Sequence, residues 1–448
     1  MDVEVDTTRV IRKVASAAMV ATTIEWYDFF IYGTAAALAF PAVFFSSHLS
    51  HLMAQLFTFA TFAVGFAVRP IGAIVFGQYG DRVGRKKALV VALVTMASAT
   101  TLIGLLPSYA ATGVFAPMAL IALRCVQGFA LGGHWGGATL LIAETAPKKR
   151  RGFYGSFGQA GAGTGTILSN LVFLLASAAL SQGDFIAWGW RIPFVLSIVM
   201  IPIALYIHLR IEDTPAFRRL AHLKEEIGSR ARLKTAPTAS QPGPKSPVLQ
   251  VFHRYPRQLA LAAGTLVGIQ VATYIMNVFA VAYATNPTGL NISRNILLGG
   301  ILVGALTLVI GIFIGGTASD RFGRRALIML GGALLGVWAF AFFPLIETRS
   351  TLCIMAAIGV GMLFDGLVNG PQAAFFAELF RTEVRYSGVS LAYQGGAIFG
   401  GGIAPMIATA LYSHFGTTVA VSVYVAFCCL ITVVSAFLSS DNYGRDLS

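Results

Sequence analysis

The sequence predicts an all-α membrane protein with twelve transmembrane helices, arranged as two pseudo-symmetric six-helix bundles. Three observations support this prediction: few charges, a series of long apolar stretches, and loop motifs that occur twice. Of the 448 residues, 56% are apolar and only 11% are charged, whereas about 25% of the residues in a soluble protein are charged. Such a chain has too little polar surface to face water on all sides, which indicates a bilayer.

Twelve apolar stretches are long enough to cross a bilayer, which takes about 20 helical residues. They cover 15–40, 53–79, 88–107, 113–143, 153–180, 190–210, 257–284, 296–317, 326–346, 351–377, 387–412 and 417–438. The segment between the sixth and seventh stretch is rich in Lys, Arg and Pro. We therefore expect an N-terminal tail (1–14), a first bundle (15–210), a linker (211–256), a second bundle (257–438) and a C-terminal tail (439–448).

The positive charges predict the orientation. Nearly all of the 32 Lys and Arg residues fall in the tails, the linker and alternate connections, and such residues are enriched on the cytoplasmic side. We therefore expect a multi-pass protein of the bacterial inner membrane with both termini cytoplasmic. The same placement argues that the net charge of +13 does not serve nucleic-acid binding. The four cysteines lie in apolar stretches without metal-ligand spacing, so we expect no metal site.

Two connections between helices share one motif, with each residue of the second copy 239 positions after the first. The first copy contains Gly77, Asp81, Arg82, Gly84 and Arg85, and the second contains Asp320, Arg321, Gly323 and Arg324. Glu144 and Arg151 likewise precede Glu378 and Arg385 by 234 positions. Two matches at nearly one offset indicate that a six-helix unit was duplicated. We expect these loops to clamp the cytoplasmic helix ends in one conformation; alternatively, their charges only obey the topology rule.

Longer motifs support a family resemblance. They are Glu25-Trp-Tyr-Asp28-Phe-Phe-Ile-Tyr32-Gly33, Arg69-Pro70-Ile-Gly72, Arg124-Cys-Val-Gln127-Gly128, Trp135-Gly136-Gly137-Ala138, Glu144-Thr-Ala-Pro147 and Arg385-Tyr-Ser387-Gly388. With the duplicated loops, they make the chain resemble the metabolite:proton symporter family of the major facilitator superfamily, and its shikimate-permease branch in particular. The resemblance implies transport of small metabolites such as shikimate, α-ketoglutarate, citrate or proline/betaine, generally with inward proton flow.

Three departures from the family pattern matter. His134 replaces the acid of the usual Gly-Gly-Glu-Trp-Gly-Gly, and Phe380-Arg381-Thr382-Glu383 replaces Phe-Pro-Thr-Arg. The long C-terminal coiled coil of the osmosensing proline/betaine carrier is also missing, which weighs against an osmosensor.

Ionisable residues inside the apolar stretches are candidates for function, because charge at membrane depth is costly. Glu25, Asp28 and Tyr32 share one helical face at spacings i, i+3 and i+7. We assign proton coupling to Asp28, Glu25 and His134, although His134 could equally be a neutral packing group. For Arg69 we favour a structural role beside a helix end.

Comparing the two halves distinguishes residues that recur, which we assign to the scaffold, from interior residues that occur in one half only. The position equivalent to Arg124 is Ile358, and the seventh stretch has Gln270, Tyr274 and Asn277 on one face where the first has acids. In the resembling fold, helices 1, 4, 7 and 10 line the central cavity. The candidate substrate-binding residues are Arg124, Tyr32, Gln127, Tyr274, Asn277, Asp365 and Asn369. Asp365 faces either the cavity, which we favour, or a neighbouring helix.

These residues suggest proton-coupled symport of a small organic acid by alternating access. In this hypothesis protonation weakens an Asp28–Arg124 pair and frees the guanidinium to bind a substrate carboxylate. The alternatives are a carrier of zwitterionic solutes, an exchanger and, more remotely, a membrane sensor. No nucleophile–base motif or phosphate loop is present in the sequence, so we expect neither an enzyme nor a cofactor. The expected partners are the substrate, protons and lipids, around a monomer.

Overall fold

The computed structural model describes residues 2–83, 85–132, 142, 146–210, 251, 253–380 and 384–440. The described residues form helices and their connections, without strands. Nine of the described helical segments are long and apolar enough to cross a bilayer, and two shorter apolar helices cover 90–105 and 115–131. Helices suit these apolar stretches because a helix satisfies its own backbone hydrogen bonds where no water is available.

The first bundle contains six long helices. They are α1 (Asp2–Leu38), α3 (His51–Val83), α4 (Arg85–Leu105), α6 (Phe115–Leu131), α8 (Arg151–Ala179) and α10 (Arg191–Arg210). Short helical segments lie in the connections: α2 (Phe40–Phe44), α5 (Tyr109–Thr112), η1 (Lys148–Arg150), α9 (Gln182–Asp184) and η2 (Phe185–Gly189). Much of the predicted 113–143 stretch beyond Leu131 lies outside the described residues, as does most of the predicted linker.

The second bundle has four uninterrupted elements and two that contain a π-helical turn. The uninterrupted helices are α15 (Arg294–Phe322), α16 (Arg324–Glu347), α17 (Thr351–Leu379) and α20 (Val419–Leu438). The seventh predicted stretch is divided into α13 (Pro256–Tyr274), η3 (Ile275–Phe279) and α14 (Ala280–Thr285). The eleventh is divided into α18 (Arg385–Ala397), η4 (Ile398–Gly402) and α19 (Ala404–Phe415). Glycines in η4 and Pro405 directly after it explain the second interruption.

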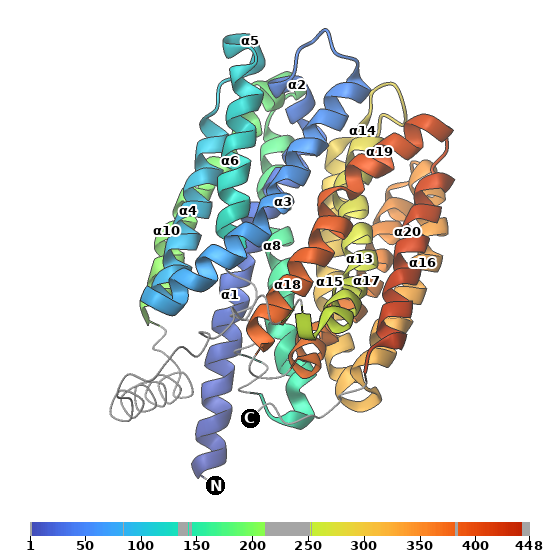
Figure 1. Ribbon diagram of the computed structural model, residues 1–448. Helices are drawn as coiled ribbons and strands as arrows, with labels where there is room; N and C mark the ends of the chain where they lie inside the picture. Colours follow the sequence, from blue (N-terminus) through green and yellow to red (C-terminus); the bar gives the residue numbers. More distant parts are fainter. Residues whose placement is uncertain are drawn as a thin grey trace.

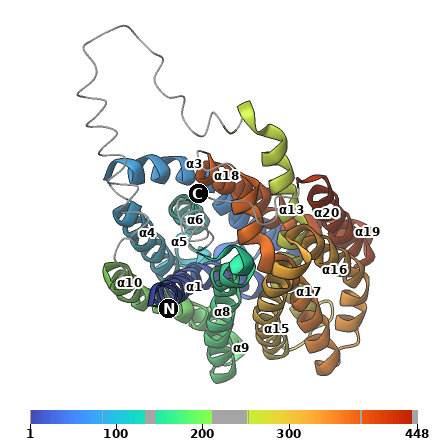
Figure 2. The same ribbon diagram turned by 90° about the horizontal axis from the view of Figure 1, so that it is seen from below.

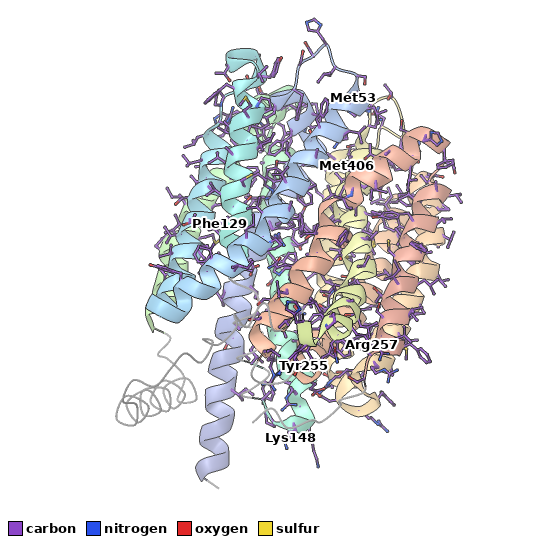
Figure 3. All side chains as sticks on the ribbon, in the orientation of Figure 1. Met53, Phe129, Lys148, Tyr255, Arg257 and Met406 are labelled. Atoms are coloured by element: carbon purple, nitrogen blue, oxygen red, sulfur yellow. The ribbon has the colours of Figure 1, made fainter. Side chains whose placement is uncertain are left out.

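The two bundles lie side by side, and the chain's two ends lie at the same end of the molecule (Figure 1). Seen along the helices, α8 lies against α15, and α3 lies near α18 (Figure 2). These two seams join the bundles. Lys148, Tyr255 and Arg257 lie at the end that carries the N terminus, and Met53 lies at the opposite end (Figure 3).

Glycine contacts confirm the duplication in three dimensions. In the first bundle, a side chain at Gly72 would collide with the Phe129 backbone, and one at Gly132 with the Arg69 backbone. In the second, Gly311 meets Leu363 and Gly366 meets Leu308 in the same way. These pairs are related by the two sequence offsets, so α3–α6 and α15–α17 pack through equivalent atoms. Small residues allow this close approach of helix backbones.

The glycine-rich part of α8 packs closely on both sides. A side chain at Gly161 would collide with Thr22 of α1, and one at Gly163 with Val309 of α15. The Thr22 hydroxyl also donates to the Gly158 carbonyl at 2.9 Å. The glycines therefore serve helix packing, and they bring α8 against both α1 and the second bundle.

Candidate functional site

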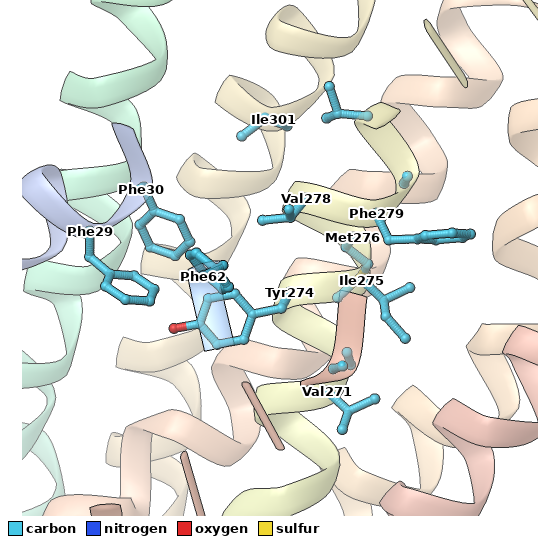
Figure 4. Close-up of a cluster of buried hydrophobic side chains, with 14 of the residues drawn as sticks. Phe29, Phe30, Phe62, Val271, Tyr274, Ile275, Met276, Val278, Phe279 and Ile301 are labelled. Carbon is cyan, nitrogen blue, oxygen red and sulfur yellow. The ribbon is translucent and has the colours of Figure 1, made fainter. Parts of the chain in front are cut away.

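An aromatic cluster lies where the two bundles meet in the middle of the molecule. Phe29 of α1 and Phe62 and Phe66 of α3 surround Tyr274 of α13, with ring centroids 5.5 to 5.6 Å from the Tyr274 ring. Figure 4 shows Tyr274 reaching towards Phe29, Phe30 and Phe62. The second bundle thus inserts one tyrosine among the phenylalanines of the first. Its hydroxyl has no hydrogen-bond partner among the described residues.

Two buried arginines stand over this cluster. The Arg124 guanidinium lies 3.9 Å from the Tyr32 ring centre and 5.0 Å from that of Phe62. The Arg69 guanidinium lies 4.0 Å from the Phe66 ring centre and 4.7 Å from that of Phe29. Cation–π attraction of this kind is worth about 2 kcal/mol when the groups are desolvated. Aromatic faces therefore help to hold two cations in an apolar interior.

A chain of hydrogen bonds connects Arg124 to Asp28. Arg124 Nη1 donates to Gln127 Oε1, Gln127 Nε2 donates to the Thr100 hydroxyl at 2.8 Å, and that hydroxyl lies 3.2 Å from Asp28 Oδ2. Asp28 Oδ1 makes no hydrogen bond within the described structure, although Ser197 lies beside the carboxyl. The direct Asp28–Arg124 pair that the sequence suggested is therefore wrong. Gln127 and Thr100 separate the two charges.

Two donors on one edge of the buried Arg124 guanidinium have no partner among the described residues. Nη1 is bonded to Gln127, whereas Nε and Nη2 have no hydrogen-bond partner in the described part of the chain. The Nε–H and one Nη2–H point in parallel, which is the geometry that accepts both oxygens of a carboxylate. Tyr32, the other predicted binding residue here, lies under the guanidinium and bonds Thr61 at 2.6 Å.

Glu25 belongs to a second charged group at the same boundary. It is buried, with 4% of its surface exposed. It lies within electrostatic reach of Arg69, Tyr274 and Tyr393. Tyr393 is on α18 and Tyr274 on α13. Glu25 and Arg69 of the first bundle therefore both interact with tyrosines of the second bundle. Arg69 therefore contacts the candidate site rather than only a helix end.

The remaining predicted binding residues form a separate cluster inside the second bundle. Asp365 Oδ2 accepts from Asn369 at 3.0 Å, and Oδ1 lies 3.1 Å from the Thr273 hydroxyl. Asn277 donates to the Thr273 carbonyl at 2.9 Å and lies 3.9 Å from the Met362 sulfur. Asp365 therefore faces the neighbouring helix α13, and its placement in the cavity stays a prediction.

Asn277 and Tyr274 face different neighbours, although the sequence placed them on one helical face. The π-helical turn of η3 begins at Ile275, directly after Tyr274. The wider turn changes the angle between successive side chains. As a result Tyr274 reaches the first bundle while Asn277 faces α17.

Several of the repeated-loop residues form a network at the end that carries the N terminus. Asp320 accepts from the backbone N–H groups of Gly152 and Phe153 at 2.9 Å each, so it caps α8 from the other bundle. Arg324 pairs with Asp320 at 2.6 Å, and Arg151 pairs with Glu378 at 3.1 Å across the bundles. Gly323, at φ +90°, allows the sharp turn between α15 and α16.

Two other residues of these loops lie elsewhere. Arg321 is exposed and stacks on Phe322 at 5.3 Å, and Arg385 donates to the Phe380 carbonyl at 3.3 Å.

The opposite end of the same seam has a second clamp. Arg294 of α15 donates to the carbonyls of Ser177 and Leu180 at 3.1 Å each, at the C-terminal end of α8. A cation there complements the helix dipole, as the Asp320 carboxylate does at the N-terminal end. Helix α15 therefore holds α8 at both of its ends.

Some predicted residues cannot be placed. His134, Glu144 and Gly84 lie outside the described residues, as do the side chains of Asp81, Arg82 and Arg85 and the surroundings of Gly77. Their assigned roles stay predictions. The backbone shows that α3 ends at Val83 and α4 begins at Arg85. In the same way, α15 ends directly before Gly323 and α16 begins directly after it.

Sequence reasoning missed Thr100, the aromatic cluster and Gly65. A side chain at Gly65 would lie 2.6 Å from Arg124 Nε, and one at Gly304 would lie 2.7 Å from Ile358 Cγ2. The same two offsets relate both pairs, so extending the repeat from the loops into the helices could have found Gly65. Nothing in the sequence marks Thr100.

Comparisons with known proteins agree with this architecture. Residues 14–447 match the model of the family described as sugar (and other) transporter. The Inner membrane metabolite transport protein YhjE of Escherichia coli is 37% identical over 97% of this chain and 95% of its own. The E. coli Shikimate transporter is 37% identical over 96% and 95%, and the E. coli Proline/betaine transporter is 31% identical over 98% and 85%.

Solved structures show the same fold. A structure of the proton:xylose symporter XylE of the major facilitator superfamily superposes with a TM-score of 0.73 over 98% of both chains, at 15% identity. The relatives and structural neighbours are transporters and not enzymes. With a family match over nearly its whole length and the duplicated helical bundles, the chain is a member of the sugar (and other) transporter family, within the major facilitator superfamily.

Proposed function

We propose that this transporter is a proton-coupled symporter of a small organic acid in a bacterial inner membrane, with both termini cytoplasmic. The observation that carries the proposal is that Arg124 Nε and Nη2, at the boundary between the bundles, have no hydrogen-bond partner among the described residues. A buried cation with two parallel unpaired donors is costly unless a ligand completes it. A carboxylate supplies the charge and both acceptors.

Asp28 is the proposed proton carrier of this site. It connects to Arg124 through Thr100 and Gln127, so a change in its charge alters the hydrogen bonds of the guanidinium. When Asp28 is ionised, the Thr100 hydroxyl donates to it, Gln127 Nε2 donates to Thr100, and Gln127 Oε1 accepts from Arg124 Nη1. When Asp28 takes up a proton, this series of hydrogen bonds weakens and Arg124 binds the substrate carboxylate more tightly. Glu25, beside Arg69 and Tyr274, is a second candidate for this role.

Alternating access requires the two ends of the interface between the bundles to open and close in turn. The Asp320 cap on α8 and the Arg151–Glu378 pair stabilise closure at one end. Arg294 on the α8 carbonyls stabilises closure at the other. Each set is polar and confined to helix ends, so each can exchange protein partners for water when its end opens.

A zwitterionic solute is the second candidate. Phe29, Phe62, Phe66 and Tyr274 form an aromatic cluster of the kind that binds quaternary ammonium groups, and a proline/betaine transporter is among the relatives. Two guanidinium groups already occupy faces of this cluster, which favours an anion over a second cation.

Uptake into proteoliposomes tests the proposal. Labelled shikimate, mono- and dicarboxylates and betaine are offered with an imposed acid-outside pH gradient. We expect accumulation of a carboxylate that a protonophore abolishes, and no uptake or binding by Arg124→Ala. Asp28→Asn should lose accumulation yet retain exchange, whereas Asp184→Asn, at an exposed acid on a helix end, should behave as the wild type.

Three outcomes would reject this function. They are accumulation of betaine without any carboxylate, accumulation that ignores the pH gradient, and full activity of the Arg124→Ala protein.

A further inference from the structure

Asp365 is a buried carboxyl group that the proposed transport site does not use. It lies in α17 with 1% of its surface exposed. Its hydrogen-bonding neighbours are Thr273 of α13 and Asn369 one turn along α17. The cluster lies next to η3, where α13 is interrupted.

The hydrogen atoms around Asp365 can be counted. The Thr273 hydroxyl has one hydrogen and lies near two oxygens: the Ile269 carbonyl at 2.8 Å and Asp365 Oδ1 at 3.1 Å. The shorter contact is the one that threonine side chains commonly make to the preceding helical turn. If the hydroxyl donates to Ile269, it presents only lone pairs to Oδ1. Two acceptors would then face each other, unless Oδ1 has a hydrogen of its own.

We propose that Asp365 is a second proton-binding site of this protein, occupied in the described conformation, with the proton on Oδ1 and donated to Thr273. Each of these contacts then has a hydrogen of its own. Asp365 Oδ1–H donates to Thr273, Thr273 donates to the Ile269 carbonyl, and Asn369 donates to Oδ2. The proton ties α17 to α13 across the second bundle.

The groups that surround Asp365 agree with a neutral carboxyl. Helix α20 brings the Cys429 thiol near Asp365, α13 contributes Thr273, and α15 contributes backbone where Leu308 and Gly311 meet Gly366. On α16, Trp338 packs against the neighbouring Phe364. Among the described residues, no Lys, Arg or His pairs with Asp365. An unpaired buried carboxylate is costly, whereas a fully bonded carboxylic acid is not.

Asp28 provides an internal comparison. The hydroxyl of its threonine partner, Thr100, likewise lies near two oxygens, the Met96 carbonyl at 2.9 Å and Asp28 Oδ2 at 3.2 Å. Thr100 also accepts from Gln127, which leads to Arg124. Asp28 therefore senses a cation through its hydrogen bonds, and Asp365 does not. The two acids belong to different bundles and have independent environments.

Infrared spectroscopy of the full-length protein in lipid tests this inference without any transport assay. At neutral pH exposed carboxyl groups are ionised, so a carbonyl band of a protonated carboxyl reports a protected acid. We expect such a band in the wild type, its shift in heavy water, and its loss in Asp365→Asn. Asparagine keeps the volume of the side chain, and Asp28→Asn serves as the matched control that leaves the Asp365 band in place.

A second variant guards against a folding defect. Thr273→Val keeps the shape of the threonine and the carboxyl of Asp365, but removes the hydrogen-bond acceptor. The Asp365 band should then move to higher frequency, because the O–H is no longer donated to Thr273. The inference is overturned if Asp365→Asn leaves the protonated-carboxyl bands unchanged, or if Thr273→Val does not move them. Failure of carboxylate uptake would leave these spectra unaffected and would reject only the proposed function.

Discussion

Replacing Gly65 by alanine tests the role of Arg124 without changing the arginine. The added Cβ would lie 2.6 Å from Arg124 Nε and 3.1 Å from Cγ and Cδ. An ordinary contact begins at 3.4 Å, so the guanidinium has to retreat by about 0.8 Å. The displaced atom is one of the two unpaired donors, and the movement pushes it away from the proposed carboxylate.

The expected magnitude follows from the hydrogen bonds. A hydrogen bond to a charged group contributes about 1.5 to 3 kcal/mol, and a displacement of this size weakens at least one of the two. Loss of about 1.5 kcal/mol corresponds to about a tenfold weaker affinity. The overpacking itself costs about 1 to 3 kcal/mol of stability, which a thermal unfolding measurement reports separately.

The duplicated fold supplies the matched control. Gly304→Ala introduces a Cβ 2.7 Å from Ile358 Cγ2, at the equivalent position of the second bundle. Both variants strain one helix contact, but only Gly65→Ala displaces a guanidinium. In proteoliposome uptake, the KM of Gly65→Ala should rise about tenfold, while Gly304→Ala keeps the KM of the wild type at a similarly lowered unfolding temperature.

Two results would refute this reasoning. If both variants raise KM equally, the effect comes from general strain and not from Arg124. If Gly65→Ala leaves KM unchanged in a folded protein, the Nε/Nη2 edge does not bind the substrate.

Three further variants probe the connected residues. Gln127→Leu interrupts the hydrogen bonds between Arg124 and Thr100, so pH-driven accumulation should fall while substrate exchange persists; intact accumulation would show that the connection is not needed for coupling. Asp320→Asn removes the negative charge from the α8 N-terminus and should cost about 1 kcal/mol, visible as a lower unfolding temperature, and an unchanged temperature would contradict the cap. Tyr274→Phe removes a buried hydroxyl that lacks a partner in the described structure, so stability should hold or improve, and a raised KM would place the hydroxyl on the substrate.

Sequence reasoning predicted the helices well because the bilayer imposes a simple rule. Each predicted apolar stretch from 15–40 to 417–438 has a helical counterpart, since a helix satisfies its own backbone hydrogen bonds in lipid. It did not predict the π-helical turns, because one extra residue in a turn leaves the apolar pattern almost unchanged. The turn at Ile275 is nevertheless what separates Tyr274 from Asn277.

The candidate site was predicted in part. Comparison of the halves identified Arg124 as unique to the first, and the structure places it with Tyr32, Gln127 and Tyr274 at the bundle boundary. It left the neighbours of Asp365 open, because a sequence gives the depth of a residue in a helix but not which neighbour it faces. Thr100 was missed, since a lone threonine in an apolar helix has no distinguishing pattern.

The sequence by itself determined the membrane class, the twelve helices, their duplication and the residues that break the duplication. These properties depend on composition and spacing, which are local along the chain. Only the tertiary structure decided that Thr100 and Gln127 stand between Asp28 and Arg124, that two donors of the guanidinium lack a partner among the described residues, and that Asp365 faces Thr273. Those facts depend on the rotation of each helix about its axis, which packing against neighbours sets.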